Sequence, residues 1–133
     1  MGDNYLHSDL TARIIRCFFK VYNTLGYGFL EKVYENAMLF ELKCNGLNCL
    51  AQVPIDVYYG NAKVGFYIAD IIVENCVVVE LKAAEALCEE HEAKLTNYLR
   101  ATDIEVGILL NFGKKPELKR KIFSTEYKNH VKS

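Results

Sequence analysis

The 133-residue sequence has no tryptophan, only two prolines, no C-x-x-C pair and no long apolar run. A membrane-spanning helix needs about 18 consecutive apolar residues, so we expect no membrane span. The five cysteines are odd in number and lack a C-x-x-C pair, which indicates reduced thiols in a cytoplasmic protein. Cys88 and His91 have the spacing of two zinc ligands, but no second pair matches them, so zinc is not expected.

A strong net charge and a phosphate-binding loop are also missing. The formal net charge is -1, so overall charge does not indicate a nucleic-acid-binding protein. Gly26 and Gly28 predict a tight bend, because neither G-x-G-x-x-G nor G-K-S/T follows them. The segment 114–133 is basic, while the rest of the chain is acidic. Such a tail can bind phosphates, with Lys114 and Lys115 as candidates, but it is more often simply solvated.

The residues that are present follow first a helical period and then an extended one. Their spacing predicts helices over about 9–25 and 30–45, strands over about 47–59, 63–73 and 76–83, a third helix ending near 102, and a strand over 106–111. A further short strand or helix is expected around 119–123. The three consecutive strands form an antiparallel meander, and the third helix crosses over to a strand that can pair in parallel. We expect one domain over residues 1–133.

Two details of these elements carry positional information. Pro54 cannot donate to a sheet ladder, which predicts an edge or bulged strand, and Gly60-Asn61 predicts a hairpin turn. The second helix is expected to bury its apolar side, formed by Val33, Ala37, Leu39, Phe40 and Leu42.

One stretch, Asp70–Lys82, places three charged side chains within two apolar strands. Side chains alternate along a strand, so Glu80 and Lys82 share a face. If the turn takes three residues, Asp70 lies opposite Glu80 on that same face. Two carboxylates and a lysine then meet, and buried charges of this kind need a partner or a metal. Oxygen ligands suit Mg²⁺ or Mn²⁺.

Plainer interpretations of the same residues remain open. An E-x-K sequence is common on strands, and its charges usually lie at a solvated strand end. Glu31, in the first turn of the second helix, suits the helix dipole without any site. In a structural or regulatory protein with surface charges, Asp70 and Glu80 would lie on opposite faces of the sheet.

The order of elements and charges resembles the PD-(D/E)XK nuclease superfamily. Asp70 stands where that family has a metal-binding aspartate, and Glu80-Leu81-Lys82 matches its (D/E)-x-K. Residues 28–34 read G-x-x-E-x-x-Y, the signature of the small prokaryotic GxxExxY family. The likeness covers about residues 9–123. It implies an α/β (α+β) fold with a restriction-endonuclease-like core, in the order α-β-β-β-α-β, whose central mixed sheet has four strands and is flanked by helices.

The resemblance also implies roles for individual residues. Asp70, Glu80 and the Leu81 carbonyl would ligate Mg²⁺ or Mn²⁺, Glu31 would bind the metal directly or through water, and Lys82 would orient the attacking water. Candidates for substrate contact or supporting hydrogen bonds form a second group: Tyr34, Lys94 and Tyr98. Two features depart from the family, since Lys94 stands where glutamine is usual and no arginine shortly precedes Asp70.

The sequence therefore predicts a divalent-metal-dependent nuclease that hydrolyses phosphodiester bonds of DNA or RNA. The alternative is a catalytically silent nuclease-like domain that binds nucleic acid or a protein partner. A single domain of low net charge has little surface for holding duplex DNA, so a homodimer or a protein partner is considered. Metal binding separates the two hypotheses, because a silent binding domain does not need to take up Mn²⁺.

Overall fold

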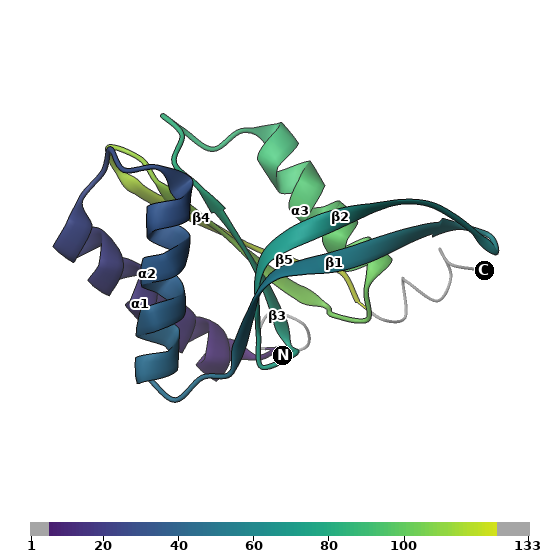
Figure 1. Ribbon diagram of the computed structural model, residues 1–133, viewed down its shortest axis with the longest axis horizontal. Coiled ribbons are helices and arrows are strands. Elements are labelled where there is room, and N and C mark those ends of the chain that lie inside the picture. The colour runs from purple at the N-terminus through teal and green to yellow at the C-terminus, as the bar shows by residue number, and fades with distance from the viewer. Residues whose placement is uncertain (1–5, 125–133) are drawn as a thin grey trace.

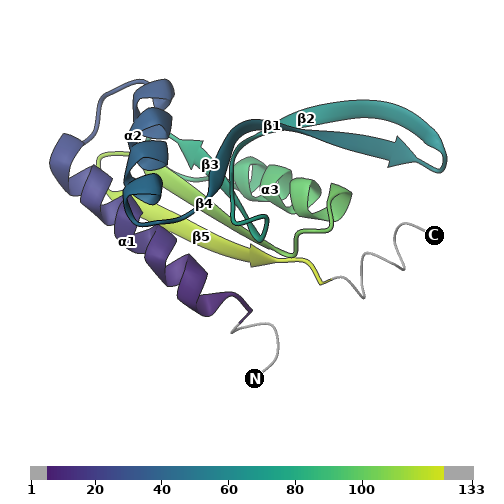
Figure 2. The same cartoon turned by 60° about the horizontal axis from the view of Figure 1, so that its bottom comes forward.

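The computed structural model describes residues 6–124. Its elements are, in chain order, α1 (Ser8–Leu25), α2 (Glu31–Cys44), β1 (Cys49–Tyr59), β2 (Ala62–Val73), β3 (Val77–Lys82), α3 (Glu89–Ala101), β4 (Val106–Phe112) and β5 (Pro116–Ile122). Helices α1 and α2 lie on one side of the sheet and α3 lies on the other (Figures 1 and 2). Within residues 6–124, no helix is both long and apolar enough to cross a membrane.

The strands form one mixed sheet in the order β1-β2-β3-β4-β5. The β1–β2, β2–β3 and β4–β5 pairs are antiparallel, and the α3 crossover makes β3 and β4 parallel, as expected. Val73 pairs with Val77 and Ile71 with Val79, so the turn takes three residues. That register is the one in which Asp70 comes opposite Glu80.

The fold class is confirmed, but the sheet has five strands instead of the four expected. The additional strand is β5, which lies at the edge beyond β4. It covers most of the stretch around 119–123, where a short strand or helix was expected, within the basic segment 114–133 that was expected to be a tail. Residues 125–133 of that segment lie outside the described part of the chain.

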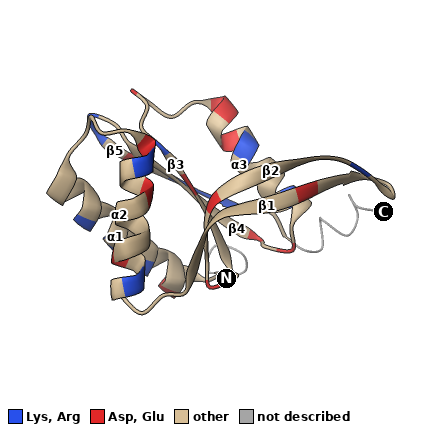
Figure 3. Ribbon diagram, viewed as in Figure 1, with Lys and Arg blue, Asp and Glu red and all other residues tan. Residues whose placement is uncertain are grey.

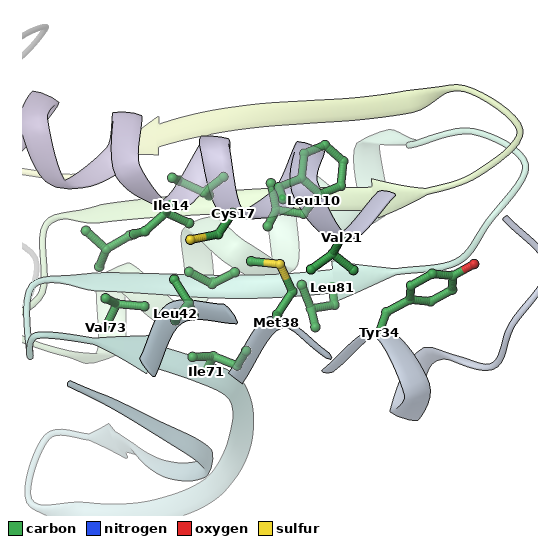
Figure 4. Close-up of a cluster of buried hydrophobic side chains, with 14 of the residues drawn as sticks. Ile14, Cys17, Val21, Tyr34, Met38, Leu42, Ile71, Val73, Leu81 and Leu110 are labelled. Atoms are coloured by element: carbon green, nitrogen blue, oxygen red, sulfur yellow. The ribbon is translucent and has the colours of Figure 1, made fainter. Parts of the chain in front are cut away.

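Two apolar clusters hold the helices to the sheet. The larger joins α1 and α2 to one face, where Ile71, Leu81 and Leu110 pack against Met38 and other side chains of α2 (Figure 4). The smaller joins α3 to the opposite face. Burial of apolar surface on both faces makes β3 and β4 the centre of the sheet.

The second helix buries only part of the face expected: Leu42 is fully buried, and Ala37 and Leu39 pack partly buried against the larger cluster. Its buried residues are Tyr34, Glu35, Met38 and Leu42. Val33 is 38% exposed and Phe40 is 70% exposed. The observed face follows the i, i+4, i+8 spacing, and it carries a carboxylate between apolar neighbours.

The β1–β2 hairpin projects beyond the body of the molecule, past α3 (Figure 1). Pro54 lies on β1, an edge strand, and Gly60-Asn61 forms the two-residue turn, as expected. The hairpin changes its packing at Asp70. Ala69 belongs to the cluster beneath α3, whereas Ile71, two residues on, belongs to the cluster beneath α1 and α2.

Candidate active site

The carboxylates of Asp70 and Glu80 each accept a hydrogen bond from a backbone N–H of the opposite strand. The Asp70 N–H donates to Glu80 Oε2 at 2.8 Å, and the Leu81 N–H donates to Asp70 Oδ2 at 2.8 Å. Glu80 is 5% exposed and Asp70 is half-buried. The two carboxylates therefore lie together, which excludes the interpretation that placed them on opposite faces of the sheet.

The pair sits where both neighbouring ladders of β2 are interrupted. Pairing of β2 with β3 ends at Ile71 and Val79. On the other side, Gln52 would be the partner of Asp70 in the β1 register, but it is unpaired and has φ 54°. A positive φ is strained for a residue other than glycine. Backbone N–H groups that would bond to a neighbouring strand in a regular ladder therefore donate to the carboxylates instead.

Burial raises the pKa values of both carboxyl groups. It raises the pKa of Glu80 from 4.5 to about 8, with the charge of Asp70 as the second cause. The pKa of Asp70 is also raised, chiefly by burial, although its hydrogen bond from Leu81 opposes the shift. Ionising both acids costs free energy because the charges are buried and because they repel each other. A cation bound between the two carboxylates would offset both costs.

Two lysines supply positive charge beside the pair. Lys82 ends β3 on the same side as Glu80, and its charge lowers the pKa values of both Asp70 and Glu80 against the larger effect of burial. Lys94, on α3, acts in the same direction on Glu80. Its Nζ also lies 5.9 Å from the centroid of the Tyr98 ring. The residue that departs from the family pattern thus lies near the carboxylates.

Tyr98 and Tyr34 occupy buried positions on opposite sides of the sheet. Tyr98 is 1% exposed, and burial followed by the charges of Glu80 and Asp70 raises its pKa. Tyr34 is fully buried, donates to the Gly26 carbonyl at 2.6 Å and stacks on another core ring. Direct contact of Tyr34 with a substrate is incompatible with that burial, so its hydroxyl supports the loop before α2.

The helix α2 brings two acids toward Asp70. Glu31 is the exposed first residue of the helix, while Glu35, one turn later, is 5% exposed. Glu35 accepts hydrogen bonds from Gln52 Nε2 at 2.6 Å and from Lys32 Nζ at 2.8 Å. Both acids raise the pKa of Asp70, and Glu35 has the larger effect.

Glu35 and Gln52 were missed in the sequence. The available signal was an acid at the i+4 position from Glu31, on the helix face that otherwise carries Tyr34, Met38 and Leu42. Nothing in the sequence marks Gln52, because its importance comes from its backbone conformation and its place opposite Asp70.

The basic candidates divide into two groups. Lys114 and Lys115 are exposed in the β4–β5 turn, which lies at the same end of the sheet as Lys82 because β3 and β4 are parallel. Other cations of the segment are used within the protein. Lys121 pairs with Glu92 at 2.6 Å, and Arg120 donates to the Leu6 carbonyl.

The donor set fits a hard divalent cation. Asp70 and Glu80 offer carboxylate oxygens, and the carbonyl of Leu81, the residue whose N–H donates to Asp70, is a further candidate. Within residues 6–124, no group of three or more His, Cys, Asp or Glu side chains is placed to hold a metal ion. Mg²⁺ does not need one, since it commonly binds through one or two carboxylates, waters and substrate phosphates.

Comparisons with known proteins agree with this geometry. A family model described as the PD-(D/E)XK nuclease superfamily matches residues 8–121. The crystal structure of SSO0001 is similar with a TM-score of 0.55 and 20% sequence identity. That match covers 70% of this chain and 50% of the other, so this chain spans about half the length of its structural relative. At such identity the likeness concerns the fold alone. A comparison with curated proteins found no match.

A mixed sheet between helices, with paired carboxylates and a lysine on its central strands, defines a nuclease-like domain. The family match extends over most of the chain, and the protein belongs to the PD-(D/E)XK nuclease superfamily. The match does not distinguish the narrower GxxExxY family, which stays a prediction from the G-x-x-E-x-x-Y residues.

Proposed function

We propose that the protein is a divalent-metal-dependent nuclease that hydrolyses phosphodiester bonds of nucleic acid. The observation that supports this most is the reciprocal bonding of Asp70 and Glu80, with Lys82 on the same side of β3. A purely structural pair of buried acids at this position would be costly without a cation. The superfamily assignment gives the same class of chemistry.

Each residue has a proposed role. Asp70, Glu80 and the Leu81 carbonyl would hold Mg²⁺ or Mn²⁺, which would polarise a phosphoryl oxygen and activate water. Lys82 orients the attacking water and stabilises the negative charge that builds on the phosphate. Glu31, which is exposed at the start of α2, would bind the metal directly or through water. Lys94, Lys114 and Lys115 attract the nucleic-acid backbone.

The remaining parts of the proposal concern context. Residues 1–133 are proposed to form one nuclease-like domain. All five cysteines are free thiols, which supports a reducing, cytoplasmic environment. A homodimer or a protein partner would enlarge the surface that contacts substrate.

The test is cleavage of labelled single- and double-stranded DNA and RNA with Mg²⁺ or Mn²⁺. We expect cutting that EDTA and Lys82→Ala abolish, while Lys20→Ala, an exposed lysine on α1, leaves it unchanged. Calorimetry with Mn²⁺ on Asp70→Ala tests the site itself. If Asp70→Ala binds Mn²⁺ as well as the parent does, the assignment is wrong.

A second candidate is a nuclease-like domain that binds without turnover. The exposed position of Glu31 favours this candidate. In the part of the chain that the structure describes, Asp70 and Glu80 are then the two carboxylates joined by hydrogen bonds at the site, and Glu31 is not joined to them. Mn²⁺ binding without cleavage of any of the four substrates would support a partner-dependent nuclease, and absence of both would support this second candidate.

A further inference from the structure

A groove of about 940 Å³ runs between the projecting hairpin and α3. Its lining includes two tyrosines of the hairpin and two polar side chains of α3, namely Tyr59, Tyr67, Asn97 and Arg100. Tyr59 is 82% exposed and Tyr67 is 42% exposed. Aromatic surface this open to water is costly unless something covers it.

The groove leads to the carboxylate pair. The Tyr67 ring lies 5.3 Å from the Tyr98 ring, measured between centroids. The Tyr98 hydroxyl in turn donates to the carbonyl of Ile68, two residues before Asp70, at 3.5 Å. The exposed tyrosines are therefore connected to the candidate active site through one layer of packed rings.

Positive charge follows the same path. Lys94 lies near Glu80 at one end, and Arg100 lines the groove two turns further along α3. The hairpin itself carries little charge beyond the site (Figure 3). Its Asp56 and Lys63 pair with each other at 3.1 Å, so they contribute almost no net charge to the groove.

From this arrangement, and resting on the proposed nuclease function, we infer that the substrate is single-stranded nucleic acid. Unpaired bases stack on Tyr59 and Tyr67, which strand alternation places on the hairpin face toward α3, while Lys94 and Arg100 attract the backbone and guide the strand toward Asp70 and Glu80. Base stacking on aromatic side chains is largely independent of sequence and is typical of single-strand binding.

A duplex fits these features less well. Its bases are already stacked and paired, so the tyrosine faces have nothing to gain from it. Duplex affinity depends mainly on neutralising many phosphates, and the groove supplies only a few positive side chains. The groove thus matches a strand whose bases are free.

The inference is tested by binding, separately from cleavage. Fluorescence anisotropy is measured in EDTA with a short labelled oligonucleotide, as a single strand and annealed to its complement. We expect the single strand to bind at least about tenfold more tightly, and Tyr59→Ala to weaken its binding by about tenfold. Tyr59→Phe retains stacking and restores binding, whereas Tyr59→Leu does not.

Matched controls come from the same molecule. Phe66, on the same hairpin, is 59% exposed but does not line the groove, so Phe66→Ala leaves binding unchanged. Arg100→Ala flattens the dependence of log Kd on log salt by about 0.7, whereas Lys20→Ala does not.

The outcomes separate this inference from the proposed function. Tight single-strand binding that requires the tyrosines, with neither cleavage nor Mn²⁺ binding, supports the groove and contradicts the nuclease. Metal-dependent cleavage with equal duplex affinity, or with Tyr59→Ala binding like the parent, overturns the groove and leaves the nuclease intact. If sedimentation shows that Tyr59→Ala and Tyr67→Ala dissociate a dimer without affecting binding, the groove is an interface between copies and the inference is wrong.

Discussion

Replacing Glu80 by glutamine is predicted to stabilise the metal-free protein at alkaline pH but not at acidic pH. Glutamine keeps the shape of the side chain and an oxygen that can accept from the Asp70 N–H. It removes a carboxyl group whose pKa is raised by burial, and then by Asp70, from 4.5 to about 8. The variant thus isolates the penalty of ionising a buried acid.

The direction follows from proton binding in the two states. Between pH 4.5 and about pH 8, Glu80 is ionised in the unfolded chain but still holds its proton in the folded protein. The folded state binds more protons, so stability falls as pH rises through that window. The penalty is absent below pH 4.5 and reaches about 4 kcal/mol by pH 8, at 1.36 kcal/mol per pKa unit.

The assay is urea unfolding followed by circular dichroism, in EDTA, at several values between pH 4.5 and pH 8. We expect the free energy of unfolding of Glu80→Gln to exceed that of the parent by a few kcal/mol at pH 8, with the gap closing toward pH 4.5. A gap of constant size at every pH would refute the reasoning, because it would show no linkage to ionisation.

The same pair of proteins reports on the metal. A ligand that binds only the folded state stabilises it by about 2.7 kcal/mol at a hundred times its Kd. Mn²⁺ is therefore expected to stabilise the parent at pH 8 and to have little effect on Glu80→Gln, which has lost a ligand. If Mn²⁺ stabilised both proteins equally, the metal would bind at a site that does not include Glu80.

Three further predictions concern residues around the site. Gly113→Ala would place its Cβ 2.6 Å from a backbone carbonyl oxygen, so we expect a loss of about 1–3 kcal/mol in urea unfolding, whereas Gly65→Ala meets nothing within 4 Å and shows no clash. Tyr34→Phe loses two hydrogen bonds of its hydroxyl and should lower stability by about 1–2 kcal/mol without changing Mn²⁺ affinity in calorimetry. Glu35→Gln should alter Mn²⁺ affinity more than Glu31→Gln, and the reverse order would assign the more important acid to the start of the helix.

The register of the site could be predicted from the sequence because strand geometry is strict. Side chains alternate with a period of two, so the length of one turn decides whether Asp70 meets Glu80. The parallel pairing of β3 with β4 was equally accessible, since a crossover helix separates them. These features depend on local periodicity and connection length, which the sequence states directly.

The fifth strand and the buried face of α2 were harder to predict for a shared reason. An edge strand pairs on one side only, so β5 can be basic and polar, and its composition resembles that of a solvated tail. On α2, exposed Phe40 contributes to the apolar pattern while buried Glu35 weakens it. In both places the composition of the segment does not match its burial, so the structure of the segment depends on the elements that it packs against.

The backbone around Asp70 lies beyond sequence patterns altogether. Regular ladders on both sides of β2 would use its backbone donors in strand pairing, but the left-handed conformation of Gln52 and the early end of the β2–β3 pairing release them. The freed N–H groups then fix the two carboxylates at a depth that raises their pKa values. A break in the sheet, a buried pair of acids and a nearby lysine are thus one arrangement, and under the proposed function the penalty of burying the acids would drive the binding of a cation.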